Sequence, residues 1–159
     1  MADTITQTRA IDRLLAEYGE SHRNPINKAI HWLAVPVIFW CVLALLSEIP
    51  FPAMPSAWLN WATVACILGT IYYAVLSPPL AVGMALWCLT CLWGIASWPG
   101  QIMPLWIGAL AIFVAAWVLQ FIGHAIEGKR PSFFKDVQFL LIGPAWLMHF
   151  LLQRAGISY

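Results

Sequence analysis

The chain has 159 residues, of which 62% are hydrophobic and only 9% are charged. An average soluble domain carries about 25% charged residues, so the composition excludes a water-facing surface and predicts one integral membrane domain, residues 1–159. The net charge of +1, with Lys and Arg divided between two short segments, argues against nucleic acid as a partner, because that binding needs a concentrated basic face.

The first 28 residues carry mixed charge and no apolar run, so we expect a retained cytoplasmic segment and not a signal peptide. Apolar residues recur there at spacings of three and four within Thr6–Ser21: Ile11, Leu14, Leu15 and Tyr18. This periodicity predicts an amphipathic surface helix. Asn24 and Pro25 then predict an N-cap and the first residue of the next helix.

Residues 49–126 contain no Asp, Glu, Lys or Arg. Four stretches within 30–124 approach or reach the about twenty residues needed to cross a bilayer. They are Ile30–Leu46, Ala57–Leu76, Pro79–Trp98 and Pro104–Gly123. Short, proline-rich connections predict antiparallel neighbours. The predicted fold class is therefore all-α, an integral membrane helical bundle with four transmembrane helices.

Two kinds of residue give this bundle an expected orientation. Tryptophans that flank the first and third turns would form an aromatic belt on one side: Trp58, Trp61, Trp98 and Trp106. Basic residues fall on the other side: Arg23, Lys28, Lys129, Arg130 and Lys135. The positive-inside rule places that side, with the loop 125–136, in the cytoplasm. The membrane would be the inner membrane of a bacterium or the endoplasmic reticulum of a eukaryote.

The C-terminal segment, 137–159, leaves two alternatives open. Val137–Leu152 is only sixteen residues long, and Gly143–Pro144 predicts a break within it. A fifth crossing would carry His149 about 18 Å along the axis, at 1.5 Å per residue, and away from the other histidines. A broken or shallow segment would keep His149 near them.

Three histidines converge on the cytoplasmic end in this topology: His22, His31 and His124. His22 and His31 are nine positions apart, and the break at Asn24–Pro25 permits them to face each other. Imidazole is the commonest protein ligand for a transition metal, so the convergence predicts a metal site, with His149 as a possible fourth ligand.

Several polar residues beside the histidines are candidates to orient them. Gln120, His124 and Glu127 share one helical face, and a ligating imidazole usually donates its second N–H to a carboxylate or amide. The expected partners are Asn24, Asn27, Gln120 and Glu127.

Two motifs carry a resemblance to a known family. They are YGESHRNPINKAIHW at residues 18–32, followed by Pro36, and QFIGHAIEGKRP at residues 120–131. The chain resembles the membrane 2-hydroxy fatty acid dioxygenase family over nearly its whole length. The resemblance implies an Fe(II)-dependent enzyme of fatty-acid α-oxidation. It would convert a 2-hydroxy fatty acid and O2 to CO2 and a fatty acid one carbon shorter.

The family's iron-associated histidines map onto His22, His31 and His124, and the fourth ligand stays open between His149, Glu127 and water. Membrane lipid is then the natural source of the substrate, and Arg23 or Lys28 would neutralise the substrate carboxylate at headgroup depth. Two other classes of function compete with this one. Two histidines on facing helices could hold a haem for electron transfer. The chain could also be a non-catalytic membrane scaffold or small transporter, although its uncharged core offers no polar path.

Overall fold

The computed structural model describes residues 9–52, 58–128 and 133–158. Within these residues the chain forms six α-helices. They are α1 (Ala10–Gly19), α2 (Pro25–Ser47), α3 (Trp61–Leu76), α4 (Pro78–Ala96), α5 (Leu105–Glu127) and α6 (Phe133–Arg154). The helical fold class is confirmed. Lys129 and Arg130 lie outside the described residues.

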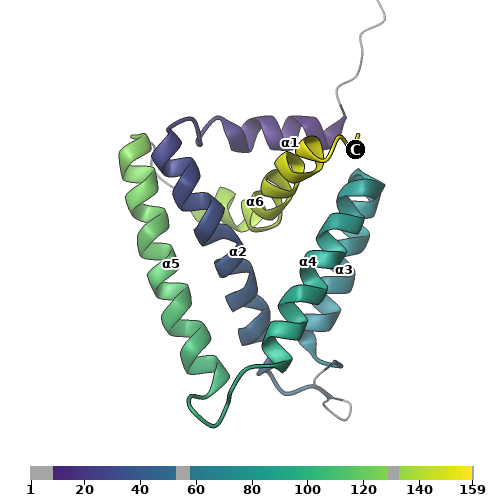
Figure 1. Ribbon diagram of the computed structural model, residues 1–159, viewed down its shortest axis with the longest axis vertical. Coiled ribbons are helices and arrows are strands. Elements are labelled where there is room, and N and C mark those ends of the chain that lie inside the picture. The colour runs from purple at the N-terminus through teal and green to yellow at the C-terminus, as the bar shows by residue number, and fades with distance from the viewer. Residues whose placement is uncertain (1–8, 53–57, 129–132, 159) are drawn as a thin grey trace, which may run out of the picture.

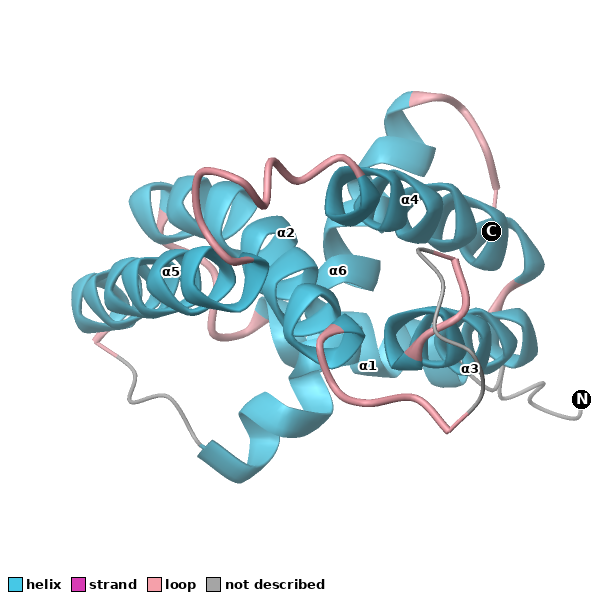
Figure 2. Cartoon of the chain, turned by 90° about the horizontal axis from the view of Figure 1, so that it is seen from below, coloured by secondary structure: helices cyan, strands magenta, loops and turns pink. Residues whose placement is uncertain are grey.

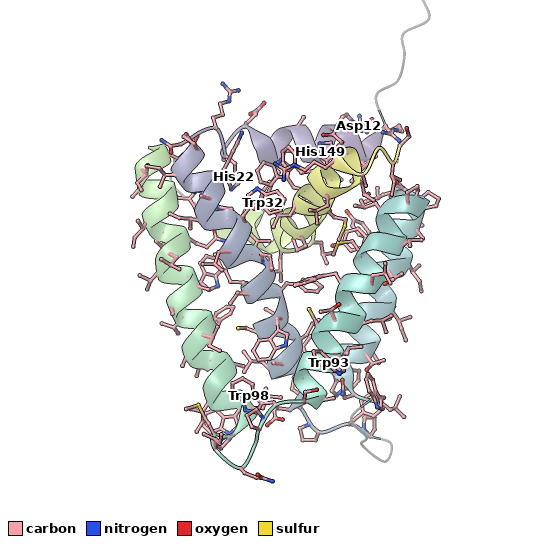
Figure 3. The ribbon with its side chains drawn as sticks, viewed as in Figure 1. Asp12, His22, Trp32, Trp93, Trp98 and His149 are labelled. Carbon is pink, nitrogen blue, oxygen red and sulfur yellow. The ribbon has the colours of Figure 1, made fainter. Side chains whose placement is uncertain are left out.

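Helices α2 to α5 run alternately away from and toward the end of the molecule that carries α1 (Figure 1). The described residues of the two connections at the opposite end are 48–52, 58–60 and 97–104, and Figure 3 places Trp98 there. Seen along the bundle, α2 lies beside α5 and α3 lies beside α4 (Figure 2), the two pairs that share the most extensive contacts. This arrangement brings the start of α2 and the end of α5 together.

The α2–α5 pair is close because α5 presents small residues to α2. Ala116 packs with Ala34 and Ile38 in a buried cluster between the two helices. Gly123 is also buried, and a Cβ added there would overlap the side chain of Asn27. Small residues at a helix interface let the two backbones approach.

The start of α2 follows the expected signals. Asn24 is the N-cap, its side chain accepting from the backbone N–H of Ile26 and Asn27, and Pro25 is the first helical residue. The helix therefore begins five residues before the expected span and carries His31 in its second turn.

Helix α1 lies across one end of the bundle (Figure 1). Its buried residues Ile11, Leu15 and Tyr18 occupy one face, as the periodicity predicted. They belong to the main core together with Ile142 and Trp146 of α6. Helix α1 is thus held to the bundle mainly through α6.

Three helices among the described residues, α2, α4 and α5, are long and apolar enough to cross a membrane. Helix α3 is apolar but shorter, with 16 residues. These helices confirm a helical membrane protein. Helix α6 stays near the α1 end in Figure 1 and does not run the length of the bundle.

The predicted break at Gly143–Pro144 is wrong, because α6 is a single helix that includes Pro144. A proline removes one backbone donor and crowds the preceding turn. The buried Tyr73 hydroxyl donates to the Leu141 carbonyl at 2.7 Å, which satisfies an acceptor in that turn. The carbonyl that loses its helical donor at Pro144 is that of Leu140, one residue earlier, so this hydrogen bond ties the same turn of α6 to α3 without replacing the missing bond.

Candidate metal centre

His22, His31 and His124 meet at the α1 end of the bundle. His22 lies in the turn between α1 and α2, His31 lies on α2, and His124 lies in the last turn of α5. Their relative exposures are only 3%, 1% and 9%. One ligand atom from each ring lies within 4.8 Å of those of the other two. The convergence expected from the topology is confirmed.

The spacings of the three rings lie within a few tenths of an ångström of those expected for ligands of one ion. Their centroids are 4.2 Å (His22–His31), 5.1 Å (His31–His124) and 5.5 Å (His22–His124) apart. With metal–nitrogen distances near 2.1 Å, rings bound at right or tetrahedral angles have centroids roughly 4.5 to 5.3 Å apart. Axial ligands on opposite sides of a haem iron have centroids roughly 6.4 Å apart, so this spacing favours a non-haem ion.

Backbone carbonyls fix the orientation of two of the rings. His22 Nδ1 lies 2.6 Å from the Tyr18 carbonyl oxygen, and His31 Nδ1 lies 2.9 Å from that of Asn27. A carbonyl oxygen can only accept, so each Nδ1 donates and each Nε2 keeps its lone pair. His22 Nε2 is buried and has no hydrogen-bond partner in the described part of the chain. A metal ion would satisfy this atom.

The protonation state of His22 also suits metal binding. Burial lowers the pKa of His22 to about 4, with a further lowering from the nearby His124. The hydrogen bond to the Tyr18 carbonyl opposes the effect without cancelling it. His22 is therefore neutral at pH 7, the form whose lone pair can bind a metal.

Two aromatic residues that sequence reasoning missed enclose His22. The Tyr18 ring stacks on the His22 ring with centroids 4.2 Å apart, and Trp146 of α6 contacts both rings at 5.4 and 5.5 Å. Tyr18 lies only four residues before His22 in the sequence, and this spacing could have pointed to it. No local signal distinguishes Trp146 from the chain's other tryptophans, because its position depends on how α6 packs.

Gln120 and Asn27, both expected to support the histidines, are buried beside them. Gln120 lies one turn before His124, and its side chain is 8% exposed. Its Oε1 accepts no hydrogen bond from the described residues. Asn27 lies one turn before His31, holds the His31 ring through its carbonyl, and donates from Nδ2 to the Ser21 carbonyl.

The charged candidates lie at the rim of the cluster. Glu127 accepts hydrogen bonds from the backbone N–H groups of Arg23 and Asn24, and it is not part of the three-histidine group. The Arg23 side chain is exposed. Lys28 is partly buried and lies close enough to His22 to affect its pKa.

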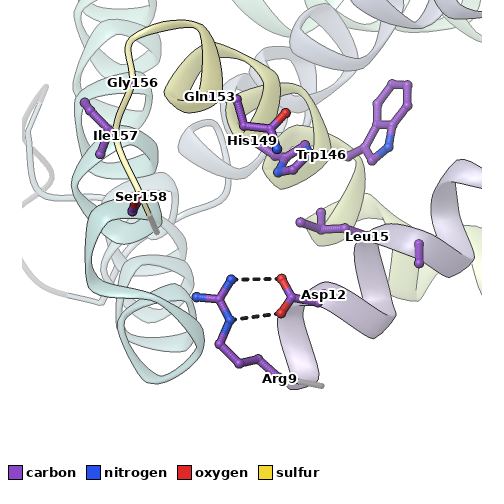
Figure 4. Close-up of a pocket in the computed structure, with 10 residues that line it drawn as sticks. Arg9, Asp12, Leu15, Trp146, His149, Gln153, Gly156, Ile157 and Ser158 are labelled. Carbon is purple, nitrogen blue, oxygen red and sulfur yellow. Dashed lines mark hydrogen bonds and ion pairs between the residues drawn. The ribbon is translucent and has the colours of Figure 1, made fainter. Parts of the chain in front are cut away.

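His149 does not join the three-histidine group. It lines a cavity of about 760 Å³ between α1 and the C-terminal end of α6 (Figure 4). Asp12 and Gln153 also line this cavity. Trp146 lines it as well and contacts His22 on the other side, so the indole forms part of the wall between the cavity and the histidines.

The fold and the site together define a helical membrane protein with a buried cluster of three histidines. The family model "2-hydroxy-palmitic acid dioxygenase Mpo1-like" matches residues 8–155, and the chain belongs to this Mpo1-like family. The 2-hydroxy-palmitic acid dioxygenase MPO1 of Saccharomyces cerevisiae is 28% identical over 144 residues, which cover 89% of this chain and 79% of the yeast protein. No solved structure gives a significant match.

Proposed function

We propose that this protein is an Fe(II)-dependent dioxygenase that converts a 2-hydroxy fatty acid and O2 to CO2 and a fatty acid one carbon shorter. Family membership supports the reaction class. The observation that carries the metal assignment is the buried group His22, His31 and His124, whose ligand atoms lie within 4.8 Å of one another. These three imidazoles would hold the ion.

The reaction balances without a separate reductant. R–CH(OH)–COOH and O2 give R–COOH, CO2 and H2O. The bond between the carboxyl carbon and the 2-carbon breaks. The carboxyl carbon leaves as CO2, and the 2-carbon becomes the new carboxyl group. All four electrons accepted by O2 come from the substrate. A ferrous ion with three imidazole ligands would supply open coordination positions for the 2-hydroxy acid and O2.

Residues around the cluster would bind and orient the substrate. Gln120 Oε1 is buried without a donor in the described residues, and the 2-hydroxyl group would supply one. Lys28 lies near His22 and would offset the carboxylate charge, with Arg23 further out at the rim. Tyr18 and Trp146 would limit access of water to His22.

The proposed membrane placement has α2, α3, α4 and α5 as four spans, with α1 and α6 on the cytoplasmic side. At 1.5 Å per residue, the 16 residues of α3 extend about 24 Å, so this span needs local thinning of the bilayer or help from flanking residues. The histidines would then lie at headgroup depth, where the hydroxy-acid end of a membrane-dissolved fatty acid lies. The bilayer would supply the substrate directly.

Anaerobic loading with Fe(II), followed by O2 and a 2-hydroxy fatty acid, tests this proposal by mass spectrometry. We expect the acid one carbon shorter, with equal molar amounts of O2 consumed and CO2 formed. His22→Ala, His31→Ala and His124→Ala should each lose stoichiometric iron and reduce turnover by more than about a hundredfold.

His149→Ala is the matched control, because this histidine lies outside the group, and it should retain iron and turnover. Full activity in all three cluster variants would refute the proposal. A strong Soret band in the purified protein would support the haem alternative. Purification without any stoichiometric transition metal, together with failure to load Fe(II), would support a scaffold.

A further inference from the structure

Glu127, the last residue of α5, reaches across to the start of α2. Its Oε1 accepts from the Arg23 backbone N–H at 2.9 Å. Its Oε2 accepts from the Asn24 backbone N–H at 2.9 Å and from Asn27 Nδ2 at 3.1 Å. Three donors therefore converge on one carboxylate, and hydrogen bonds to an ionised acceptor are the stronger kind.

These donors belong to the segment that holds two of the histidines. Arg23 directly follows His22, and the Asn27 carbonyl accepts from His31 Nδ1 at 2.9 Å. Asn27 Nδ2 also donates to the Ser21 carbonyl at 3.1 Å, on the other side of His22. The carboxylate of Glu127 thus contacts the backbone next to His22 and the side chain of the residue that orients His31.

The third histidine shares a helix with this carboxylate. His124 lies three residues before Glu127, in the last turn of α5. The bonds from Glu127 therefore fix the end of α5 relative to the turn that carries His22 and to the first turns of α2. Chain segments about one hundred residues apart are joined here by one side chain.

We infer that Glu127 is a positioning residue for the histidine cluster and not one of its ligands: it ties the elements that carry the three imidazoles into the spacing a metal ion requires. This inference rests on the proposed function. All three groups facing Glu127 are donors, so they favour the ionised carboxylate, which only accepts hydrogen bonds. Glutamine would place an NH2 group against one or more of them.

The test uses Co(II) alone as the probe on the metal-free, full-length protein in detergent. The visible absorption bands of bound Co(II) report its ligands, and the titration reports its affinity. Glu127→Gln should weaken Co(II) binding by about ten- to hundredfold. The bands at saturation should match those of the wild type, because the same three imidazoles bind the ion.

Glu48→Gln is the matched control, since it removes a carboxylate at the other end of α2, and it should bind Co(II) like the wild type. If Glu127→Gln fails to fold, Glu127→Asp keeps the charge but shortens the reach, and its affinity should still fall. Thermal unfolding of the metal-free variants separates lost affinity from lost fold.

Wild-type affinity in a folded Glu127 variant would overturn the inference. Saturated bands that differ from those of the wild type would also overturn it, because Glu127 would then be a ligand. If the wild type itself binds no Co(II), the proposed metal site fails and the inference fails with it. If the wild type binds Co(II) and the Glu127 variants bind it equally well, the inference about Glu127 fails and the proposed metal site stands.

Discussion

Gly123 sets how closely α5 approaches α2 beside the candidate metal centre. A Cβ added there would overlap the Asn27 side chain and meet Ile30 at 3.5 Å. Asn27 is fully buried and cannot move away without losing its bonds to Ser21 and Glu127. Gly123→Ala should therefore push α5 outward and displace His124. We expect about 1–3 kcal/mol of lost stability and at least a roughly tenfold loss of Co(II) affinity.

Gly69→Ala on α3 is the control for this substitution. An added Cβ at Gly69 meets nothing within 4 Å, so the variant should unfold at or slightly above the wild-type temperature and bind Co(II) normally. Equal Co(II) affinity for Gly123→Ala and the wild type would show that close helix contact is not needed for the histidine spacing.

The three histidines and the polar residues beside them could be predicted from the sequence, whereas the particular contacts that hold the rings in place could not. A four-span topology alone brings His31 and His124 to one end, and Asn24–Pro25 allows His22 to turn toward them. The contacts of Trp146 and the bonds of Glu127 depend on how α6 and α5 pack. Glu127 and His149 both remained possible ligands because a sequence gives residue types but no distances.

Among the elements, α6 shows most clearly how tertiary contacts override a local signal. Pro144 predicted a break, yet α6 is one helix from Phe133 to Arg154. The start of α2, by contrast, was predictable because an N-cap followed by proline is decided within a few residues. Elements fixed by local chemistry follow the sequence pattern, and elements fixed by packing do not.

The hydrogen bond from Tyr73 of α3 to the Leu141 carbonyl of α6 gives an element-scale prediction. Tyr73 is 1% exposed, so Tyr73→Phe would leave the partly buried Leu141 carbonyl without this donor. Losing a typical hydrogen bond costs about 0.5–1.5 kcal/mol. We expect a lower thermal unfolding temperature in detergent, with the circular dichroism of a helical protein retained below it.

Tyr72→Phe removes the same hydroxyl group from the adjacent position, where the side chain is 37% exposed. Its unfolding temperature should stay close to that of the wild type. If the two variants lose equal stability, the bond from Tyr73 to Leu141 makes no specific contribution to holding α6 against α3.

At the scale of the whole molecule, charge is segregated along the bundle. Every Lys and Arg lies at or before residue 28 or at or after residue 129, so the connections 48–60 and 97–104 contain none. The described residues of both connections lie at the end opposite α1 (Figure 1). A cytoplasmic excess of Lys and Arg sets membrane orientation, so the α1 end should face the cytoplasm.

Cysteine labelling of the chain expressed in bacterial cells tests this orientation together with the number of spans. The four native cysteines are buried, so background labelling should be low. Gln101→Cys, in the exposed 97–104 connection, should react with a membrane-impermeant maleimide added to intact cells once the outer membrane is made permeable. Glu20→Cys, in the exposed turn after α1, should react only after the inner membrane is opened. The reverse pattern would place the histidines on the outer face, and labelling of both from one side would show that the four spans are miscounted.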